Sequence, residues 1–339
     1  MTRSLNFRRA ARSAGKKEVL MITICVVGAG GHSRSNHGPS LKRFVEQNPG
    51  VAELRAIADL DRDRAESYAR DFGFKKTYIN FHSMIEEVKP DAIVAVTPVA
   101  LTAQIIGELL PYGVPLLMEK PPGLSAKETT DLLHRSELSK TPVMISLNRR
   151  FNPALTSTRT WIDEQRVEQP RIILARMLRV NRLEPEFIVG TGIHLIDTVI
   201  SLLGSAARVS SHRWDTSAEG KCCTARIEND NQMAAEIAII PDTGVSEERY
   251  ELLGPDYAVR IDTSRSSVSI VCEGNLVVER SFDHEPSFIA GGAFGETTSF
   301  LNAVRNNTGF SPNLLDGVLS MQTAEAIEKG GIHDLTQTR

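Results

Sequence analysis

Two segments of this sequence carry side chains that could move a proton near neutral pH. In GTGIHLIDTVISLLG, which ends at Gly204, His194 and Asp197 stand three positions apart. If the segment is helical, side chains at that spacing share a face and meet. A histidine beside a carboxylate suits general acid–base catalysis. A His–Asp pair taken alone is more often a structural contact, so the spacing indicates a candidate and no more.

The second segment is VPLLMEKPPG, in which Glu119, Lys120 and Pro121 follow an apolar run. The run predicts a buried strand, and open α/β sheets bind ligands at the carboxyl ends of their strands. A lysine there can hydrogen-bond a substrate hydroxyl or carbonyl and stabilise negative charge that develops on the oxygen. The alternative is a solvated lysine in a stiff proline turn. We expect a cis peptide bond before Pro121.

A glycine-rich turn near the start of the chain is suited to a nucleotide. The strand-like run ITICVV leads into GAGGHS, with Gly28 and Gly30 at the first two positions of GxGxxG and Ser33 at the third. Gly28 permits the tight turn, and Gly30 lets backbone amides approach a pyrophosphate. We expect Gly31 and His32 to contact the same ligand. Because the third position is serine, the fingerprint depends on its strand–turn–helix context.

The next strand-like run ends in Asp59, where a carboxylate could accept both ribose hydroxyls of an adenosine. Asp59 could instead only cap the following helix. The turn and the acid together predict dinucleotide binding. An acid here repels a 2′-phosphate and so favours NAD, with NADP as the alternative because Arg62 and Arg64 lie nearby.

A doubly wound parallel sheet would bring these residues together. Strand-like runs alternate with helical stretches and begin at Ile22, Glu53, Asp91, Val114 and Val143. That alternation is typical of a parallel α/β sheet. We therefore expect a Rossmann dinucleotide-binding domain over residues 21–147.

Beyond residue 147 the pattern changes. Helical segments surround RIILARMLRV, and from Ala207 to Phe282 short strand-like runs are separated by turn signals such as ENDN, PDTG and EGN. These signals predict a C-terminal α/β domain over residues 148–339, built on a large, mainly antiparallel open sheet. Two more helical stretches end the chain.

Composition excludes several classes of protein. The chain has 339 residues, with 39 Lys+Arg against 42 Asp+Glu, so it has no strong field to attract nucleic acid or an anionic membrane. With 41% hydrophobic and 24% charged residues, it is not wholly disordered. The longest apolar run, VLMITICVV, is too short to span a bilayer.

The four cysteines show no metal-type spacing, and we expect no bound metal. They predict reduced thiols and a cytoplasmic location. Residues 1–20 are basic, and we expect them to form a poorly ordered extension rather than the alternative, an export signal.

Together these motifs resemble the glucose–fructose oxidoreductase / inositol dehydrogenase / MocA (Gfo/Idh/MocA) family. The matching segments are GAGG at Gly28, IAD ending at Asp59, TP at Thr97, EKP at Glu119, NRRF at Asn148, GIHLID at Gly192, SPNLLDG at Ser311 and AEAI at Ala324. The resemblance implies a Rossmann domain followed by an α/β domain that binds substrate. The open sheet of that domain commonly mediates oligomerisation, here into a homodimer or homotetramer. The implied activity is NAD(P)-dependent oxidation or reduction of sugars, cyclitols and related compounds.

The resemblance also implies roles for individual residues. Lys120 is similar to the lysine that binds the reacting hydroxyl, His194 to the general base, and Asp197 to the acid that often accompanies it. Thr97–Pro98 are similar to contacts on the nicotinamide side, and Glu119 to a contact with the nicotinamide ribose. We take Lys120 as a cofactor contact as well.

Two departures from the family pattern leave alternatives open. An aspartate often stands four residues before the histidine, where this chain has Gly190, and a histidine often follows TP, where it has Thr102. Losing the aspartate removes an orienter of Lys120 and His194. The leading hypothesis is hydride transfer to or from a secondary alcohol. The alternatives are a non-catalytic NAD-sensing or regulatory protein, and a redox-neutral enzyme of the epimerase or glycosidase type.

Arginines could favour an acidic substrate such as a sugar acid. Arg176 and Arg179 lie in RIILARMLR, and Arg149 and Arg150 begin the second domain. Arginine suits bidentate carboxylate contacts. Arg176 and Arg179 would point to opposite faces of a regular strand. We take Arg176 and Arg150, together with Asp197, as candidate substrate contacts.

Overall fold

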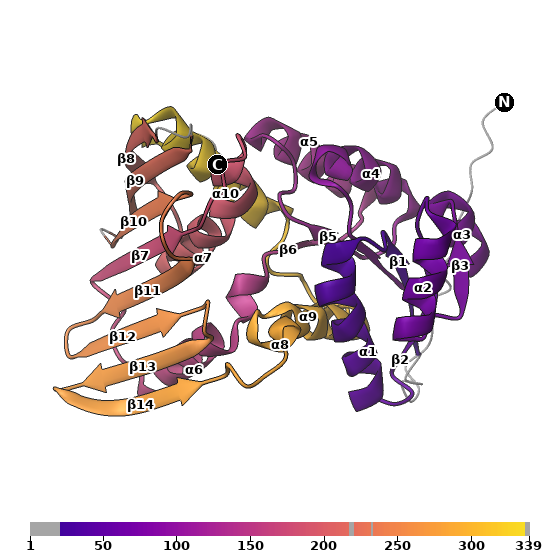
Figure 1. Ribbon diagram of the computed structural model, residues 1–339, viewed down its shortest axis with the longest axis horizontal. Coiled ribbons are helices and arrows are strands. Elements are labelled where there is room, and N and C mark those ends of the chain that lie inside the picture. The colour runs from indigo at the N-terminus through magenta and orange to yellow at the C-terminus, as the bar shows by residue number, and fades with distance from the viewer. Residues whose placement is uncertain (1–20, 217–219, 232, 336–339) are drawn as a thin grey trace.

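The computed structural model describes residues 21–216, 220–231 and 233–335, so the predicted basic extension lies outside the described residues. Figure 1 shows two sheets side by side, with helices between them. The first sheet is parallel, in the order β3-β2-β1-β4-β5-β6. Its strands are β1 (Ile22–Val27), β2 (Ala52–Ala58), β3 (Lys76–Tyr78), β4 (Ala92–Ala95), β5 (Leu116–Glu119) and β6 (Val143–Ser146). This order confirms the predicted Rossmann sheet.

Three α-helices of this half begin where polar side chains cap them. Asp61, Asn80 and Ser125 each accept a hydrogen bond from a backbone amide in the first turn of the helix that follows. The helices are α1 (Gly38–Gln47), α2 (Arg62–Phe72), α3 (Phe81–Val88), α4 (Thr102–Leu109) and α5 (Ala126–Ser139), with short 3₁₀ turns η2 (Val99–Leu101) and η3 (Leu110–Tyr112). A π-helical turn, η1 (Ser33–His37), precedes α1. Helical backbone therefore follows the glycine turn almost at once.

The second sheet has nine strands in the order β14-β13-β12-β11-β7-β10-β9-β8-β15. All neighbours are antiparallel except β7 and β10, which confirms the predicted mainly antiparallel sheet. The strands are β7 (Ile172–Leu178), β8 (Arg208–Asp215), β9 (Lys221–Glu228), β10 (Ala234–Ile240), β11 (Glu247–Leu253), β12 (Tyr257–Asp262), β13 (Ser267–Cys272), β14 (Asn275–Ser281) and β15 (Gly331–Asp334).

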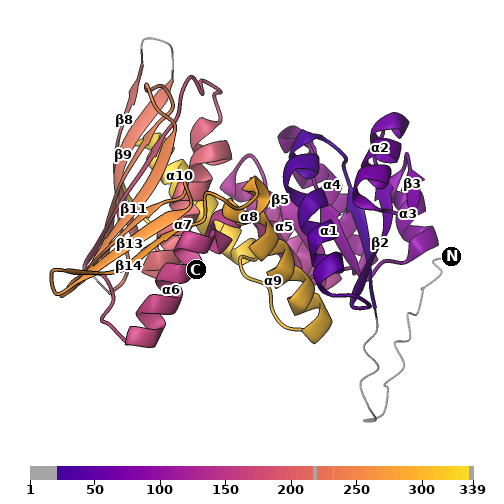
Figure 2. The ribbon, with the colours of Figure 1, turned by 60° about the horizontal axis from the view of Figure 1, so that its bottom comes forward.

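Helices cover one face of this second sheet. Figure 2 shows α6 (Pro153–Gln165), α7 (Ile193–Leu203) and α10 (Leu314–Lys329) on the face that turns toward the first sheet, and none of the described helices lies on the opposite face. The burial of β7 alternates residue by residue, as expected for a strand with one covered face. Side chains on the covered face therefore point toward the junction of the two halves.

The junction is built from both ends of the second half. A 3₁₀ turn, η4 (Asn148–Phe151), follows β6, and a π-helical turn, η5 (Ile188–Gly192), leads into α7. Near the end of the chain, α8 (Ser287–Ala290) and α9 (Ala293–Asn306) return to the first sheet. Phe300 and Leu301 of α9 share an apolar core with Ile24 of β1. The strands of the parallel sheet come before residue 147 and those of the nine-stranded sheet come after it. We propose this residue as the boundary between two domains.

The structure also bears on the predicted cis peptide bond, the cysteines and the possibility of a membrane-spanning helix. The Lys120–Pro121 bond is cis, as predicted, and a second cis bond, Ser311–Pro312, was not expected. Cys25, Cys222, Cys223 and Cys272 form no disulfide. Within the described ranges, no helix has the length and apolar character needed to cross a membrane.

Candidate active site

The glycine turn has two distinct parts. Gly28 has φ +99°, and a Cβ there would stand 1.9 Å from the carbonyl oxygen of Val96, so only glycine fits. At Gly30 and Gly31 a Cβ would meet no neighbouring atom within 4 Å. Ser33, at the third position, is fully buried and hydrogen-bonds the Tyr68 hydroxyl at 2.9 Å. Gly28 therefore serves the fold, whereas Gly30 and Gly31 leave space for a ligand.

That space is a cavity of about 400 Å³ at the carboxyl ends of β1, β2 and β4. It is lined by seven of the residues predicted to contact a cofactor, namely Gly28, Gly30, Gly31, His32, Asp59, Thr97 and Pro98. The residues present fit a dinucleotide, because the wall at Gly30 is open and a carboxylate stands at the end of β2.

Asp59 fixes the floor of this cavity. Its Oδ2 accepts the Ala29 amide at 2.8 Å, and its Oδ1 accepts the Asp61 amide at 2.9 Å and lies 3.0 Å from Nη2 of Arg64. The N-cap of α2 is Asp61, so the alternative that Asp59 only caps this helix is wrong. The Arg64 guanidinium partly neutralises the carboxylate that favours NAD over NADP.

Glu119 is held by two histidines. Its Oε1 lies 2.6 Å from Nε2 of His37 and 3.1 Å from Nε2 of His32. Burial alone would raise the pKa of Glu119, but the hydrogen bonds from His32 and His37 outweigh it and hold that pKa well below its ordinary value. The same hydrogen bond raises the pKa of His32. Glu119 is 5% exposed and does not line the cavity, so the predicted ribose contact has no support here.

The π-helical turn η1 makes this cluster. His32 and His37 are five positions apart, a spacing that a regular α-helix would rotate by about 140°. A π turn closes over five residues, and here both imidazoles reach one carboxylate oxygen. His37 could not be predicted from the sequence, because a spacing of five residues from His32 indicates a shared contact only when the turn is known to be π-helical.

Lys120 reaches from the end of β5 to the other half of the chain. Its Nζ donates to the carbonyl oxygen of Gly190, in η5, at 2.9 Å. Within the described part of the chain, no carboxylate lies close enough to Lys120 to form an ion pair. Burial lowers the pKa of Lys120.

His194 lies one turn further along, near the start of α7, and is 8% exposed. Burial lowers the pKa of His194 well below its ordinary value, and the charges of Lys120 and Arg149 lower it further. Its Nδ1 has no hydrogen-bond partner in the described residues. His194 is therefore an uncharged imidazole at pH 7, within reach of the charge of Lys120.

Asp197 does not accompany His194, which corrects the sequence interpretation. Both oxygens of Asp197 bind the Arg150 guanidinium, at 2.7 and 2.8 Å, and Ser320 donates to Oδ1 at 3.0 Å. Asp197 is 1% exposed, so its partners are all protein groups. A buried bidentate pair of this kind is stronger than a neutral His–Asp contact. Neither Asp197 nor its partner Arg150 is brought to the dinucleotide cavity.

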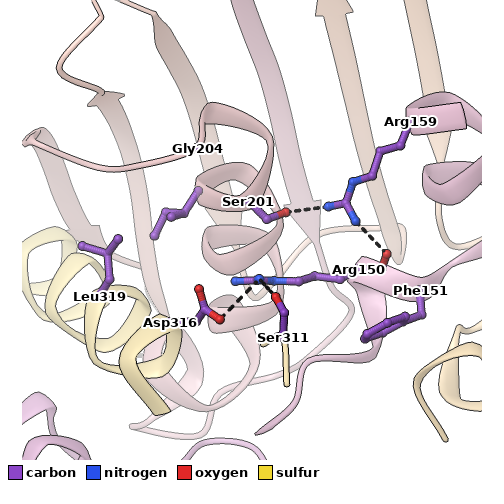
Figure 3. Close-up of a pocket in the computed structure, with 9 residues that line it drawn as sticks. Arg150, Phe151, Arg159, Ser201, Gly204, Ser311, Asp316 and Leu319 are labelled. Carbon is purple, nitrogen blue, oxygen red and sulfur yellow. Dashed lines mark hydrogen bonds and ion pairs between the residues drawn. The ribbon is translucent and has the colours of Figure 1, made fainter. Parts of the chain in front are cut away.

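Arg150 instead lines a separate cavity of about 440 Å³ between η4, α6, α7 and α10 (Figure 3). In this cavity Arg159 donates to Ser201 at 2.8 Å and to the Arg150 carbonyl at 3.1 Å. Ser201 lies two helical turns beyond His194, so this cavity is distinct from the Lys120–His194 region.

Arg176 is also placed away from the site. It is on the helix-free face of β7, is half-exposed and pairs with Glu247 at 2.6 Å. Because the sheet separates it from α7, the predicted substrate contact by Arg176 is wrong. Arg179 follows β7 and binds the buried Glu248 at 2.6 Å. Glu248 also accepts from Arg149 Nε at 3.1 Å, an ion pair that the sequence did not predict.

Comparison with known proteins agrees with this geometry. Residues 22–147 match the family described as an oxidoreductase family with an NAD-binding Rossmann fold, GFO_IDH_MocA. The first sheet and its helices therefore match the Gfo/Idh/MocA oxidoreductase family. This confirms the resemblance and the NAD-binding nature of the first sheet.

Curated relatives of this chain include cyclitol dehydrogenases. It is 29% identical over 180 residues to scyllo-inositol 2-dehydrogenase (NAD(+)) of Bacillus subtilis, covering 50% of this chain and 52% of that protein. It is 29% identical over 122 residues to inositol 2-dehydrogenase of Rhizobium meliloti, covering 36% of each. The matched part spans about half the length of such curated relatives or less.

Solved structures share the whole fold. Levoglucosan dehydrogenase in complex with NADH matches with a TM-score of 0.78 and 17% identity, over 93% of this chain and 99% of that one. An oxidoreductase from Agrobacterium radiobacter in complex with NAD+, L-tartaric acid and magnesium matches with a TM-score of 0.79 and 15% identity, over 94% and 99%. At these identities the likeness establishes the fold.

Proposed function

We propose that this protein is an NAD(P)-dependent dehydrogenase of the Gfo/Idh/MocA family. It would transfer a hydride between a secondary alcohol carbon, in a sugar, cyclitol or sugar acid, and the nicotinamide. The observation that carries the proposal is the contact between Lys120 and Gly190, which brings an ammonium from one half of the chain beside an imidazole from the other. The names of the inositol and levoglucosan dehydrogenases support this substrate class.

The cavity residues would hold the dinucleotide by their usual chemistry. Backbone amides near Gly30 would face the pyrophosphate, Asp59 the adenosine ribose, and Thr97–Pro98 the nicotinamide side. When bound, the nicotinamide supplies the hydride acceptor.

Lys120 and His194 would then act on one substrate oxygen. Lys120 hydrogen-bonds the alcohol oxygen and stabilises the negative charge that grows there as the proton leaves. His194, neutral at pH 7, takes that proton. The substrate carbon gives up a hydride with its electron pair, so the alcohol becomes a carbonyl and the imidazole becomes an imidazolium. In the reverse direction the imidazolium returns the proton.

The open face of the nine-stranded sheet is the surface that we propose for a homodimer or homotetramer. Light scattering of the purified chain measures this directly, and a monomer at micromolar concentration would contradict it.

The function is tested with a panel of polyols, sugars and sugar acids, offered with NAD and with NADP and followed by nicotinamide absorbance. Accumulation of reduced nicotinamide in step with substrate loss supports a dehydrogenase. Substrate conversion by bound NAD without net reduction would indicate the redox-neutral alternative. Tight NAD binding without conversion of any compound would indicate the regulatory alternative.

A further inference from the structure

We propose that Arg149 forms a carboxylate-binding subsite beside Lys120 and His194, so that the substrate is an anionic polyhydroxy acid of the aldonate or uronate class. This inference rests on the proposed dehydrogenase function and narrows its substrate class.

The fold places Arg149 at the site. Glu119, the residue before Lys120, pairs in parallel register with Ser146 of β6. The turn η4 begins two residues after Ser146 and packs against α7, the helix that carries His194. Arg149 therefore stands at the same sheet edge as Lys120 and against the helix of the imidazole. Consistent with this position, its charge acts on both Lys120 and His194.

The guanidinium of Arg149 has unused hydrogen-bond donors. Its Nε donates to Oε1 of Glu248 at 3.1 Å, and within the described ranges this is its one side-chain hydrogen bond. The side chain is 24% exposed, whereas that of Glu248 is 1% exposed. The Nη edge of Arg149 is left to bind a planar, bidentate acceptor, and carboxylates have that geometry.

Charge at this position is not balanced by the protein. Glu248 is shared by Arg149 and Arg179 and also accepts from the Tyr250 hydroxyl at 2.9 Å. One carboxylate thus faces two guanidinium groups. The two arginines are only partly buried, and an anion that binds there would compensate their excess positive charge.

Across the site, the charge of Glu184 acts on Lys120, but this carboxylate is already paired with Arg182. Lys120 binds a backbone carbonyl at Gly190, and a Cβ at Gly190 would meet no neighbouring atom within 4 Å. Next to it, Arg182 donates to Thr191 at 3.1 Å and pairs with Glu184. Glu119, the nearest buried carboxylate, is already held by His32 and His37. A substrate carboxylate would therefore meet donors.

The test compares matched substrates and matched arginine variants. Aldonates and uronates are offered beside the neutral alditols and aldoses of the same configuration, and the ratio of kcat/KM for acid over neutral compound is measured. We expect the ratio to exceed one in the natural protein and to fall by about 10- to 100-fold in Arg149→Gln, mainly through KM. Arg176→Gln, on the helix-free face, is the control and should leave the ratio unchanged. A preference for neutral compounds, or an unchanged ratio in Arg149→Gln, would overturn the inference.

A second variant covers the case in which Arg149→Gln fails to fold. Gly190→Asp adds a carboxylate where there is open space, so it should lower the same ratio without any change at Arg149. An unchanged ratio in Gly190→Asp would count against the subsite.

A binding measurement separates this inference from the proposed function. The protein loaded with NADH is titrated with D-gluconate and with D-glucitol by calorimetry, which needs no turnover. Saturable binding of D-gluconate that is lost in Arg149→Gln and kept in Arg176→Gln supports the subsite even if no compound reduces NAD. Absence of D-gluconate and other aldonate or uronate binding would overturn it even if neutral polyols are oxidised.

Discussion

The ammonium of Lys120 lies 2.9 Å from the carbonyl oxygen of Gly190, so one hydrogen bond joins the end of the Rossmann sheet to the turn that leads into α7. A backbone carbonyl does not titrate, and it can orient the lysine without adding a charge. Burial meanwhile lowers the pKa of Lys120. This arrangement keeps Lys120 directed at the region of His194 although no aspartate stands at position 190.

Substitution of Lys120 or His194 tests their proposed roles. Lys120→Ala or His194→Ala should lower kcat by about 10²- to 10⁴-fold, because each removes a group that acts on the reacting oxygen. NADH affinity, followed by fluorescence, should stay within about threefold of the natural value, since neither residue forms the dinucleotide cavity. Full turnover in both variants would contradict the mechanism.

The pH dependence follows from the directions of two pKa shifts. The pKa of His194 lies well below 6.5, so the imidazole is already neutral at pH 6.5 and the acid limb of kcat/KM should fall below that pH. The pKa of Lys120 lies below 10.5, so the alkaline limb should begin before pH 10.5. A pH–rate profile for alcohol oxidation measures both limbs. An acid limb centred above pH 6.5 would rule out His194 as the base in this form.

Acid should also act on stability through His194. The unfolded chain takes up a proton on this residue near pH 6.5, whereas the folded chain resists it, so the free energy of unfolding should fall as the pH drops below 6.5. His194→Gln should show a weaker fall over the same range in urea titrations. Identical slopes in the two proteins would indicate that the imidazole is charged in the folded state.

Alanine at Gly28 and at Gly30 should have opposite effects. Gly28→Ala places a Cβ 1.9 Å from the Val96 carbonyl at a positive φ, so it should destabilise the protein by about 3 kcal/mol or more. Gly30→Ala meets no protein atom and should leave the melting temperature almost unchanged while it weakens NAD binding, because the methyl group projects into the cavity. Thermal melts with and without NADH separate the two outcomes. NAD binding that survives in Gly30→Ala would place the pyrophosphate elsewhere.

Two carboxylates, Asp197 and Asp316, lie near Arg150, and the effects of their substitution on the free energy of unfolding can be compared. Asp197→Asn breaks a buried bidentate pair and should cost about 3–5 kcal/mol. Asp316 lies 3.8 Å from the same guanidinium, is partly exposed, and also caps α10 by accepting the Asn313 amide at 2.8 Å. Loss of its ion pair in Asp316→Asn should cost less than about 1 kcal/mol beyond the loss of this cap. Asp316→Glu, which keeps the charge, estimates that capping contribution. Equal losses for Asp197→Asn and Asp316→Asn in urea unfolding would contradict this view of Arg150.

Much of the fold follows from local pattern. The β-branched runs and capping residues of the first half predict strands and helices because the same side chains that favour each element also bury its apolar face. The glycine turn can be predicted in the same way, since a strand, a tight turn and a helix follow one another in the sequence. The residues that line the dinucleotide cavity could therefore be named in advance.

Contacts for which several tertiary neighbours compete could not be predicted from the sequence. Helical spacing would allow Asp197 to contact His194, but Asp197 binds the Arg150 guanidinium, which comes from another segment of the chain. His37 joins Glu119 only because η1 is π-helical, and no pattern of apolar residues predicts that turn. The location of Arg176 depended on which face of β7 would be covered, and the covering helices lie far away in sequence. Each of these outcomes requires knowledge of tertiary neighbours.

The return of α9 to the first sheet has a consequence for how the protein is made. Phe300, Leu301 and Phe310 complete a core that begins with β1, so the nucleotide-binding half lacks part of its interior until residue 310 has left the ribosome. A ribosome-bound fragment that ends near residue 290 should expose apolar surface and be sensitive to protease, although all six strands of its parallel sheet have already been synthesised.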